Sequence, residues 1–187
     1  NKPVGMLSQK AARSDESLVE HLISYLIQSH ALTEEDLRTF RPSICNRLDR
    51  NTSGIVAAGK TLQGLQILSG LFKERTLHKY YLCIVKGVIK EEQDVRGWLL
   101  KNEKTNQVRI FKNETKDARP IHTKYRPLAD NGQETLLEIE LLTGRTHQIR
   151  AHLSYMGHPI FGDPKYGDAV LNKKLTSGYG LHMQLLH

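Results

Sequence analysis

The strongest constraint on the fold is a change in the spacing of the apolar residues partway along the chain. Through residues 18–26 and 65–72 apolar side chains recur every three or four positions, which is typical of one face of a helix. From residue 80 onward they alternate with polar residues instead, most regularly at Leu137, Ile139 and Leu141, which predicts strands with one buried face. We therefore predict an α+β fold with a mostly antiparallel, mixed β-sheet core and flanking helices.

Turn residues and capping patterns set the bounds of the predicted elements. Ser17 and Glu20 have the spacing of a capping box at the start of the first helix. The predicted apolar face of that helix consists of Leu18, Leu22, Tyr25 and Leu26. The further predicted elements are a short helix from near Thr33, a buried strand at 55–58, a helix over 61–75, strands at 80–85 and 135–142, a hairpin or exposed insertion within 101–119, and a helix over 146–155.

Length and charge narrow the class of protein. With 187 residues the chain is long enough to bury a core as one domain, and no apolar run approaches the roughly 18 residues that a membrane span requires. There are 27 Lys and Arg against 20 Asp and Glu, a net charge of +7, which points to a polyanionic partner: RNA or DNA first, an anionic membrane second. Cys45 and Cys83 form neither a disulfide framework nor a zinc signature, so we expect a reduced, cytoplasmic setting.

The first segment with candidate chemistry is Asn-Arg-Leu-Asp-Arg-Asn-Thr-Ser-Gly at 46–54. In an extended stretch Arg47 and Asp49 project to the same side. A carboxylate flanked by guanidiniums stays ionised, because nearby positive charge lowers its pKa, so Asp49 is a candidate nucleophile or electrostatic stabiliser rather than a general acid. The alternative is a surface salt-bridge cluster followed by a turn.

The second segment is Leu-Thr-Gly-Arg-Thr-His-Gln-Ile-Arg-Ala-His-Leu at 142–153. Thr143 or Thr146 is a candidate cap for the predicted helix, whose first turn is crowded by Arg145, His147, Gln148 and Arg150. Two arginines at the positive end of a helix dipole are unfavourable, which favours an acidic partner: an RNA phosphate or the Asp49 carboxylate. The alternative is an ordinary basic helix face.

Cofactor signatures are missing from the sequence. His147, His152 and His158 are spaced by five and six positions, which does not place them on one helix face, and no His-Glu-x-x-His pattern occurs. No glycine-rich phosphate loop is present either. We therefore expect neither a metal nor a nucleotide cofactor.

Taken together, the motifs resemble those of the RluA/RluC family of RNA pseudouridine synthases. The likeness rests on the two segments above and on Gly-His-Pro-Ile-Phe-Gly-Asp at 157–163. Three shorter matches add to it: Asn-Lys-Pro-Val-Gly at 1–5, Lys-Tyr-Tyr-Leu-Cys-Ile-Val-Lys-Gly at 79–87, and Leu-His-Met at 181–183. Asn46 and Cys83 depart from the family pattern, which has His and Ala at these positions.

The resemblance implies a pseudouridine synthase catalytic fold over 1–187 and a role for each matching residue. Asp49 is similar to the family's catalytic aspartate, Tyr81 to the tyrosine that stacks on the target uracil, and Arg150 to the basic residue that pairs with the aspartate. Ile149 would lie against the base, and Arg47 would fill the gap left by a flipped nucleotide. The residues expected to contact the RNA elsewhere are Lys79, Arg145, His147 and Gln148.

The resemblance also implies the function. We expect an isomerase that makes pseudouridine in structured RNA, with large-subunit ribosomal RNA favoured and transfer RNA as the alternative. A non-catalytic RNA-binding module and a metal-dependent hydrolase are competing interpretations. We expect a monomer, and the opening at Asn1 without an initiator Met or a signal peptide suggests a fragment from which an upstream RNA-binding module has been removed.

Overall fold

The computed structural model describes residues 1–175 and 185–186. The chain forms two compact units, Asn1–Leu77 and His78–His187. The expectation of one catalytic domain over the whole chain stays a prediction. Among the described residues, no helix has both the length and the apolar character needed to cross a membrane.

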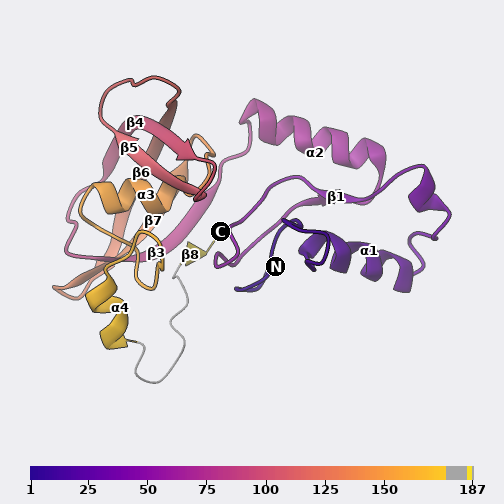
Figure 1. Ribbon diagram of the computed structural model, residues 1–187, viewed down its shortest axis with the longest axis horizontal. Coiled ribbons are helices and arrows are strands. Elements are labelled where there is room, and N and C mark those ends of the chain that lie inside the picture. Colours follow the sequence, from indigo (N-terminus) through magenta and orange to yellow (C-terminus); the bar gives the residue numbers. More distant parts are fainter. Residues whose placement is uncertain (176–184, 187) are drawn as a thin grey trace. The chain divides into compact units, whose positions relative to one another are not determined.

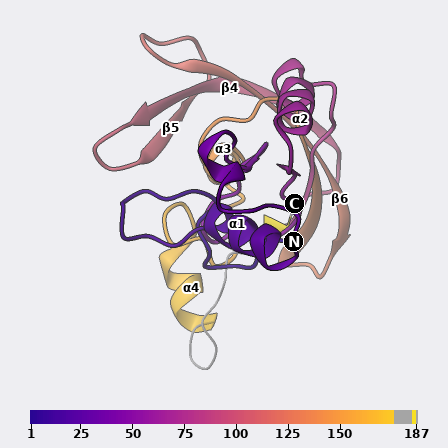
Figure 2. The ribbon, with the colours of Figure 1, turned by 90° about the vertical axis from the view of Figure 1, so that its right-hand side faces the viewer.

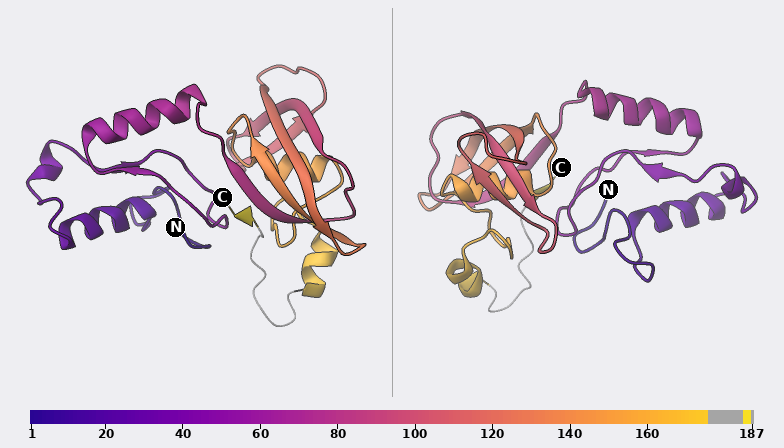
Figure 3. Two further views of the ribbon diagram at one scale, coloured as in Figure 1. Left: turned by 180° about the vertical axis from the view of Figure 1, so that it is seen from behind. Right: turned by 45° about the horizontal axis from the view of Figure 1, so that its top comes forward.

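The first unit places short extended segments between two helices. Its elements are α1 (Leu18–Gln28), the 3₁₀ turn η1 (Asp36–Arg38), β1 (Ser43–Ile44), β2 (Ala58–Gly59) and α2 (Leu62–Glu74). β1 and β2 pair antiparallel, and α1 and α2 lie on opposite sides of the extended segments in Figures 1 and 3. The helix predicted over 61–75 is confirmed: the Thr61 hydroxyl accepts a hydrogen bond from the Gly64 N–H at 3.1 Å, which caps α2.

Three predictions for this unit are wrong in detail. Ser17 directly precedes α1, but its side chain makes no cap, because its hydroxyl donates to the Glu20 carboxylate at 2.6 Å instead. Leu26 of the predicted face of α1 is buried, but Tyr25 is 63% exposed, because the buried stripe runs through Ile23 rather than Tyr25. The predicted buried strand at 55–58 shrinks to β2, and Ile55 is 67% exposed. The cause is Asn46, whose amide donates to the Ile55 carbonyl at 3.3 Å and accepts from the Ala57 N–H at 2.8 Å, so a side chain makes hydrogen bonds that a neighbouring strand would otherwise make.

The second unit is an antiparallel sheet, as predicted. Its strands are β3 (Tyr80–Lys86), β4 (Gln93–Asn102), β5 (Gln107–Phe111), β6 (Arg119–Asp130), β7 (Glu134–Leu141) and β8 (Leu185–Leu186), in the spatial order β5-β4-β6-β7-β3-β8. Every named pair is antiparallel. The sheet curls, so β4 and β6 follow an arc in Figure 2, and a register shift between Pro127 and Ala129 adds to the bend.

One helix covers the inner face of this sheet. α3 (Gln148–Tyr155) places Ala151 against Leu99, Val108 and Ile121, which come from β4, β5 and β6. The predicted alternation of β7 is confirmed, since Leu137, Ile139 and Leu141 are all buried. The last described helix, α4 (Ala169–Leu175), follows a turn after α3, and the Leu-His-Met match at 181–183 lies outside the described residues.

Candidate functional site

Asp49 lies in the first unit, on a loop whose backbone is held by buried partners. The hydroxyl of Ser8 donates to the Leu48 carbonyl at 2.7 Å and accepts from the Leu48 N–H at 3.0 Å. Leu48 is buried, Asp49 is half-buried, and Arg47 on the other side of Leu48 is exposed. The Thr52 N–H donates to the Asp49 carbonyl, which closes a turn directly after the carboxylate. The loop thus presents Asp49 from a fixed backbone.

Lys2 also holds the Asp49 loop in place, a role that sequence reasoning missed. Its side chain is buried and donates to the carbonyls of Pro3, Met6 and Arg50 at 3.0, 2.9 and 3.2 Å. Its backbone also pairs with Gly54 in both directions. Burial lowers the pKa of Lys2, and the negative charge of Asp49 acts in the opposite direction. A single lysine before a proline carries no sequence signal for this role, because its partners are backbone carbonyls.

Tyr81 lies in the second unit, on the inner face of β3. It is buried together with Cys83 and Val85, whereas its neighbour Tyr80 is 50% exposed on the other face. In the register of the sheet Tyr81 lies opposite Ile139 of β7. The structure therefore gives Tyr81, and not Tyr80, the inward position.

Arg150 and Ile149 are both buried on α3. The Nε and Nη2 atoms of Arg150 donate to the two carboxylate oxygens of Asp163 at 2.7 and 2.8 Å, and its guanidinium lies 5.3 Å from the centre of the Tyr166 ring. Burial alone would raise the pKa of Asp163, but the hydrogen bonds and the charge of Arg150 outweigh it, so the pKa lies below its usual value.

Asp163, the last residue of the Gly-His-Pro-Ile-Phe-Gly-Asp segment, also holds the turn that follows it. One of its oxygens accepts the N–H groups of Lys165 and Tyr166 at 2.8 and 3.1 Å. Sequence reasoning missed the ion pair because the two partners are 13 positions apart, in two separate motifs, and the order of residues in neither motif indicates their contact. The predicted pairing of Arg150 with Asp49 joins residues of different units and stays a prediction.

The turn before α3 is built around the side chain of Gln148. Its amide oxygen accepts from the Thr143 hydroxyl at 2.8 Å and from the Arg145 N–H at 3.1 Å. Its amide nitrogen donates to the His122 carbonyl and to the Thr123 hydroxyl at 3.1 and 3.0 Å. Gln148 is buried, so its amide makes four hydrogen bonds inside the protein, and its predicted contact with RNA stays a prediction.

This arrangement replaces the predicted threonine cap. The residue before α3 is His147, which has a left-handed backbone with φ 52° and makes no side-chain cap. Its Nδ1 atom lies 2.9 Å from the Tyr166 hydroxyl, and that hydroxyl also accepts the Val108 N–H of β5 at 2.9 Å. Neither Thr143 nor Thr146 caps the helix, because neither is the residue directly before it, and the Thr143 hydroxyl donates to the Gln148 amide oxygen instead.

The three histidines considered as metal ligands have different partners. The Nδ1 atom of His147 is hydrogen-bonded to the Tyr166 hydroxyl, that of His152 to the Thr123 hydroxyl at 3.1 Å, and that of His158 to the Lys86 carbonyl at 3.0 Å. Burial lowers the pKa of His152 to about 4, and the nearby His122 acts in the same direction. No group of three potential ligands that could hold a metal occurs among the residues that the structure describes.

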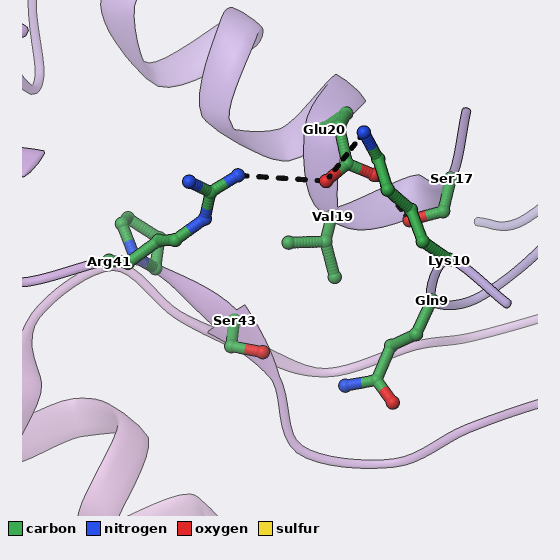
Figure 4. A pocket seen from close by; sticks show the side chains of 8 residues that line it. Gln9, Lys10, Ser17, Val19, Glu20, Arg41 and Ser43 are labelled. Atoms are coloured by element: carbon green, nitrogen blue, oxygen red, sulfur yellow. Dashed lines mark hydrogen bonds and ion pairs between the residues drawn. The ribbon is translucent and has the colours of Figure 1, made fainter. Parts of the chain in front are cut away.

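A hollow of about 310 Å³ lies beside the start of α1 in the first unit, and none of the predicted site residues lines it (Figure 4). Lys10 and Arg41 point from two sides at one oxygen of Glu20, at 3.7 and 3.6 Å, and the Ser17 hydroxyl donates to the other at 2.6 Å. Because Glu20 lies within ion-pair distance of both cations, we assign no ligand to this hollow.

The site residues are thus divided between the units. Arg47 and Asp49 belong to the first. The second carries Lys79, Tyr81, Arg145, His147, Gln148, Ile149 and Arg150. Among these, the structure groups the α3 residues with the turn that precedes the helix, and it places Tyr81 on the inner face of the sheet.

Comparison with known proteins shows what this chain is similar to. Residues 1–155 match the family model described as RNA pseudouridylate synthase. The ribosomal large subunit pseudouridine synthase C of Vibrio cholerae is 39% identical over 159 residues, which cover 82% of this chain and 49% of that protein. Synthase C of Escherichia coli is 36% identical over 160 residues, covering 82% and 50%, and synthase D of Borreliella burgdorferi is 33% identical over 178 residues, covering 94% and 54%.

The chain therefore spans about half the length of the curated relatives it matches. Among solved structures, human RNA pseudouridylate synthase domain containing 1 aligns with a TM-score of 0.71 and 24% identity, covering 88% of this chain and 66% of that one. Human RNA pseudouridylate synthase domain containing 4 aligns with a TM-score of 0.71 and 20% identity, covering 99% and 76%. These two likenesses show a shared fold. With the family match over residues 1–155 and relatives that are 33–39% identical, the chain belongs to the RNA pseudouridylate synthase family.

Proposed function

We propose that the protein is an isomerase that converts uridine to pseudouridine in RNA, with Asp49 as its central catalytic group. The observation that carries the proposal is the Asp49 loop, whose backbone is fixed by Lys2 and Ser8 within the segment that matches the family. The names of the relatives in Vibrio and Escherichia make large-subunit ribosomal RNA the first expected substrate, and transfer RNA the second.

The proposed reaction involves no oxidation or reduction, so a carboxylate can catalyse it without a redox partner. It breaks the glycosidic C–N bond and joins carbon 5 of the same uracil to the ribose, so no electrons enter or leave. The Asp49 carboxylate would either attack the anomeric carbon or remove a ribose proton to form a glycal, and both routes stay open. The detached ring must turn and rejoin, so the site has to hold the base in place.

We propose that Tyr81, Ile149 and Arg150 act on the same nucleotide as Asp49. The inward position of Tyr81 suits a ring that stacks on the uracil, and Tyr81 or a water would assist removal of the proton from carbon 5. Ile149 would lie against the base. Arg150, whose guanidinium is oriented by Asp163, would orient the Asp49 carboxylate.

The target base is inaccessible inside a duplex, so the nucleotide has to flip out of the stack. Arg47 is exposed, and we propose that its guanidinium occupies the gap that the base leaves. Lys79, Arg145 and His147 would contact phosphates around the flipped nucleotide. A monomeric state and a cytoplasmic location stay predictions from the sequence.

The test is tritium release from RNA labelled at carbon 5 of its uracils, since forming pseudouridine expels that hydrogen. Asp49→Asn removes the nucleophile and base while it keeps the size of the side chain. We expect release to fall by at least ~100-fold, in line with the loss of a positioned catalytic base. Large-subunit ribosomal RNA and transfer RNA are assayed separately, which identifies the substrate.

Glu35→Gln is the matched control, because it also converts a carboxylate to an amide, on an exposed residue of the same unit. It should release tritium at the native rate. Equal release from native protein and Asp49→Asn would contradict the assignment of Asp49. RNA binding without release from either would favour a non-catalytic RNA-binding module.

A further inference from the structure

A groove of about 330 Å³ lies in the second unit, between the ends of two strands and the turn that precedes α3. It is formed by the end of β4, the segment that leads into β6, and the turn before α3. Its charged lining consists of Lys101, Glu103, Asp117, Arg119 and Arg145. Of these, only Arg145 belongs to a motif that the sequence analysis singled out.

The register of the sheet explains why two strand cations face this groove. Arg119 of β6 lies opposite Leu99 of β4, and Lys101 of β4 lies opposite Val108 of β5. Directly paired residues point to the same face of a sheet. Since Leu99 and Val108 belong to the core that α3 covers, Lys101 and Arg119 point to the α3 side as well.

The third cation comes from the turn before α3, the helix that covers the inner face of the sheet. Arg145 lies in the turn before α3, and its backbone N–H is bound by the Gln148 side chain, which fixes the place from which its guanidinium extends. Cations from the strands and from the turn therefore line one groove. The arrangement follows from the antiparallel register and from the point at which α3 begins.

Two of the three cations are available to a ligand. Lys101 pairs with Glu103 at 2.6 Å. Arg119 and Arg145 are exposed, and within residues 1–175 and 185–186 neither guanidinium has a hydrogen bond or an ion pair. Asp117 offsets part of their charge, but the lining still holds three cations against two carboxylates. This contrasts with the hollow beside α1, where Glu20 lies within 3.7 Å of both cations.

Guanidinium groups bind phosphate oxygens through paired N–H donors. The lining contains no aromatic side chain, which single-stranded RNA sites use to stack bases. We propose that this groove binds the phosphate backbone of the RNA substrate, with Arg119 and Arg145 as the phosphate ligands and Lys101 in support. The proposal rests on the proposed function and extends the RNA surface from the α3 turn to the β4–β5 hairpin.

Arg119→Gln is the decisive variant, since it removes one exposed guanidinium and leaves the motif residues intact. Binding of a fluorescent single-stranded oligouridylate is measured from about 50 to 200 mM salt, where phosphate contacts have their largest effect on affinity. We expect binding to weaken about 10-fold. The slope of log affinity against log salt should become shallower by about 0.7–1, the contribution of one phosphate. Arg119→Lys keeps the charge and should recover part of both effects.

Arg109→Gln is the matched control. Arg109 is exposed on β5 opposite Leu100, so it points to the other face of the hairpin and lies outside the groove. It should leave both affinity and salt slope unchanged. If Arg109→Gln weakens binding as much as Arg119→Gln, or if Arg119→Gln has no effect, the groove is not a phosphate site.

Tritium release separates this proposal from the proposed function. For Arg119→Gln the loss should appear as a higher KM for the RNA, to a similar degree for different RNA sequences. A loss confined to one sequence would indicate base reading and overturn the proposal. Normal release with unchanged oligouridylate binding in Arg119→Gln contradicts the groove alone. No release from the native protein, together with weakened binding in the variant, contradicts the proposed function alone.

Discussion

Arg150 and Asp163 bury two opposite charges in the second unit, and each residue depends on the other. Asp163 is 1% exposed and Arg150 is 6% exposed. Their two parallel hydrogen bonds, with Tyr166 beside the guanidinium, compensate for the loss of water. A residue that the resemblance links to catalysis is therefore also part of the packing of α3.

We expect Asp163→Asn to destabilise the protein strongly. The variant keeps the shape of the side chain but removes the negative charge that the buried Arg150 guanidinium binds through two hydrogen bonds, which typically costs about 3–5 kcal/mol. Denaturation in urea measures the free energy of unfolding. Asp168→Asn, at the half-buried partner of the exposed Lys86, is the control and should cost about 1 kcal/mol or less. A similar small loss for Asp163→Asn would show that the buried pair does not hold α3.

At the scale of elements, the turn over 143–148 determines where α3 begins. Gln148 joins Thr143 and Arg145 of the turn to His122 and Thr123 of β6 through one side chain. His147, with its left-handed backbone, reverses the chain directly before the helix. The buried side-chain amide of Gln148 thus fixes the backbone from which the Arg145 side chain extends.

We predict that Gln148→Met loosens this turn without changing the volume of the core. Methionine fills a similar space but removes the four hydrogen bonds of the amide, among them the one to the Arg145 N–H, at a cost of about 1–3 kcal/mol in the free energy of unfolding. The KM for RNA should rise, because Arg145 loses its fixed backbone. Gln133→Met, in the exposed turn between β6 and β7, is the control for both measurements. An unchanged KM in Gln148→Met would separate the turn from RNA binding.

Sequence patterns predicted the elements whose burial follows a period, and missed those held by single side chains. The alternation at Leu137 and Ile139 located β7, and Thr61 located the start of α2, because both signals are local. The prediction of a buried strand at Ile55 was wrong because the side-chain amide of Asn46, nine positions earlier in the chain, donates a hydrogen bond to the Ile55 carbonyl. The α3 cap was misassigned because His147, and not a threonine, is the residue before the helix, and it has a left-handed backbone and makes no side-chain cap.

The candidate site was predictable to the extent that its residues form contiguous motifs. Asp49, Tyr81 and Arg150 were found because each lies in a segment with a recognisable order of residues. Lys2 and Asp163 also lie in matching segments, at 1–5 and 157–163, but their roles were missed, because these roles come from carbonyls and a guanidinium that only folding brings near them. Long-range polar contacts of this kind leave no trace in hydrophobic spacing.

At the scale of the whole molecule, the response of stability to acid depends on a histidine that is buried without charge. The pKa of His152 is about 4 in the folded protein against an unfolded value of 6.5, since burial disfavours its protonated form. Between these values the unfolded chain binds more protons than the folded one, so the free energy of unfolding falls as the pH falls. The contribution is complete above pH 6.5 and lost below about pH 4.

We predict that unfolding monitored in urea across this pH range shows a loss of about 3 kcal/mol from His152 alone. His152→Asn keeps a partner for Thr123 and should remove that part of the slope. His30→Asn, at an exposed position with a left-handed backbone that asparagine tolerates, is the control and should keep it. The pKa of Asp163 lies below its usual value, so protonation of Asp163 should cause a separate loss at lower pH. Identical slopes in native protein and His152→Asn would contradict this account.

The buried ammonium of Lys2 also has a consequence for the order in which the protein folds. It joins Lys2 to the Arg50 carbonyl, 48 positions along the chain, and the pairing of Lys2 with Gly54 closes the same loop. Closing a loop of that length costs entropy before any contact repays it, and contacts of large sequence separation slow folding. The Asp49 loop therefore reaches its final conformation only when the segment around Lys2 packs against it, which makes this a late step in the folding of the first unit.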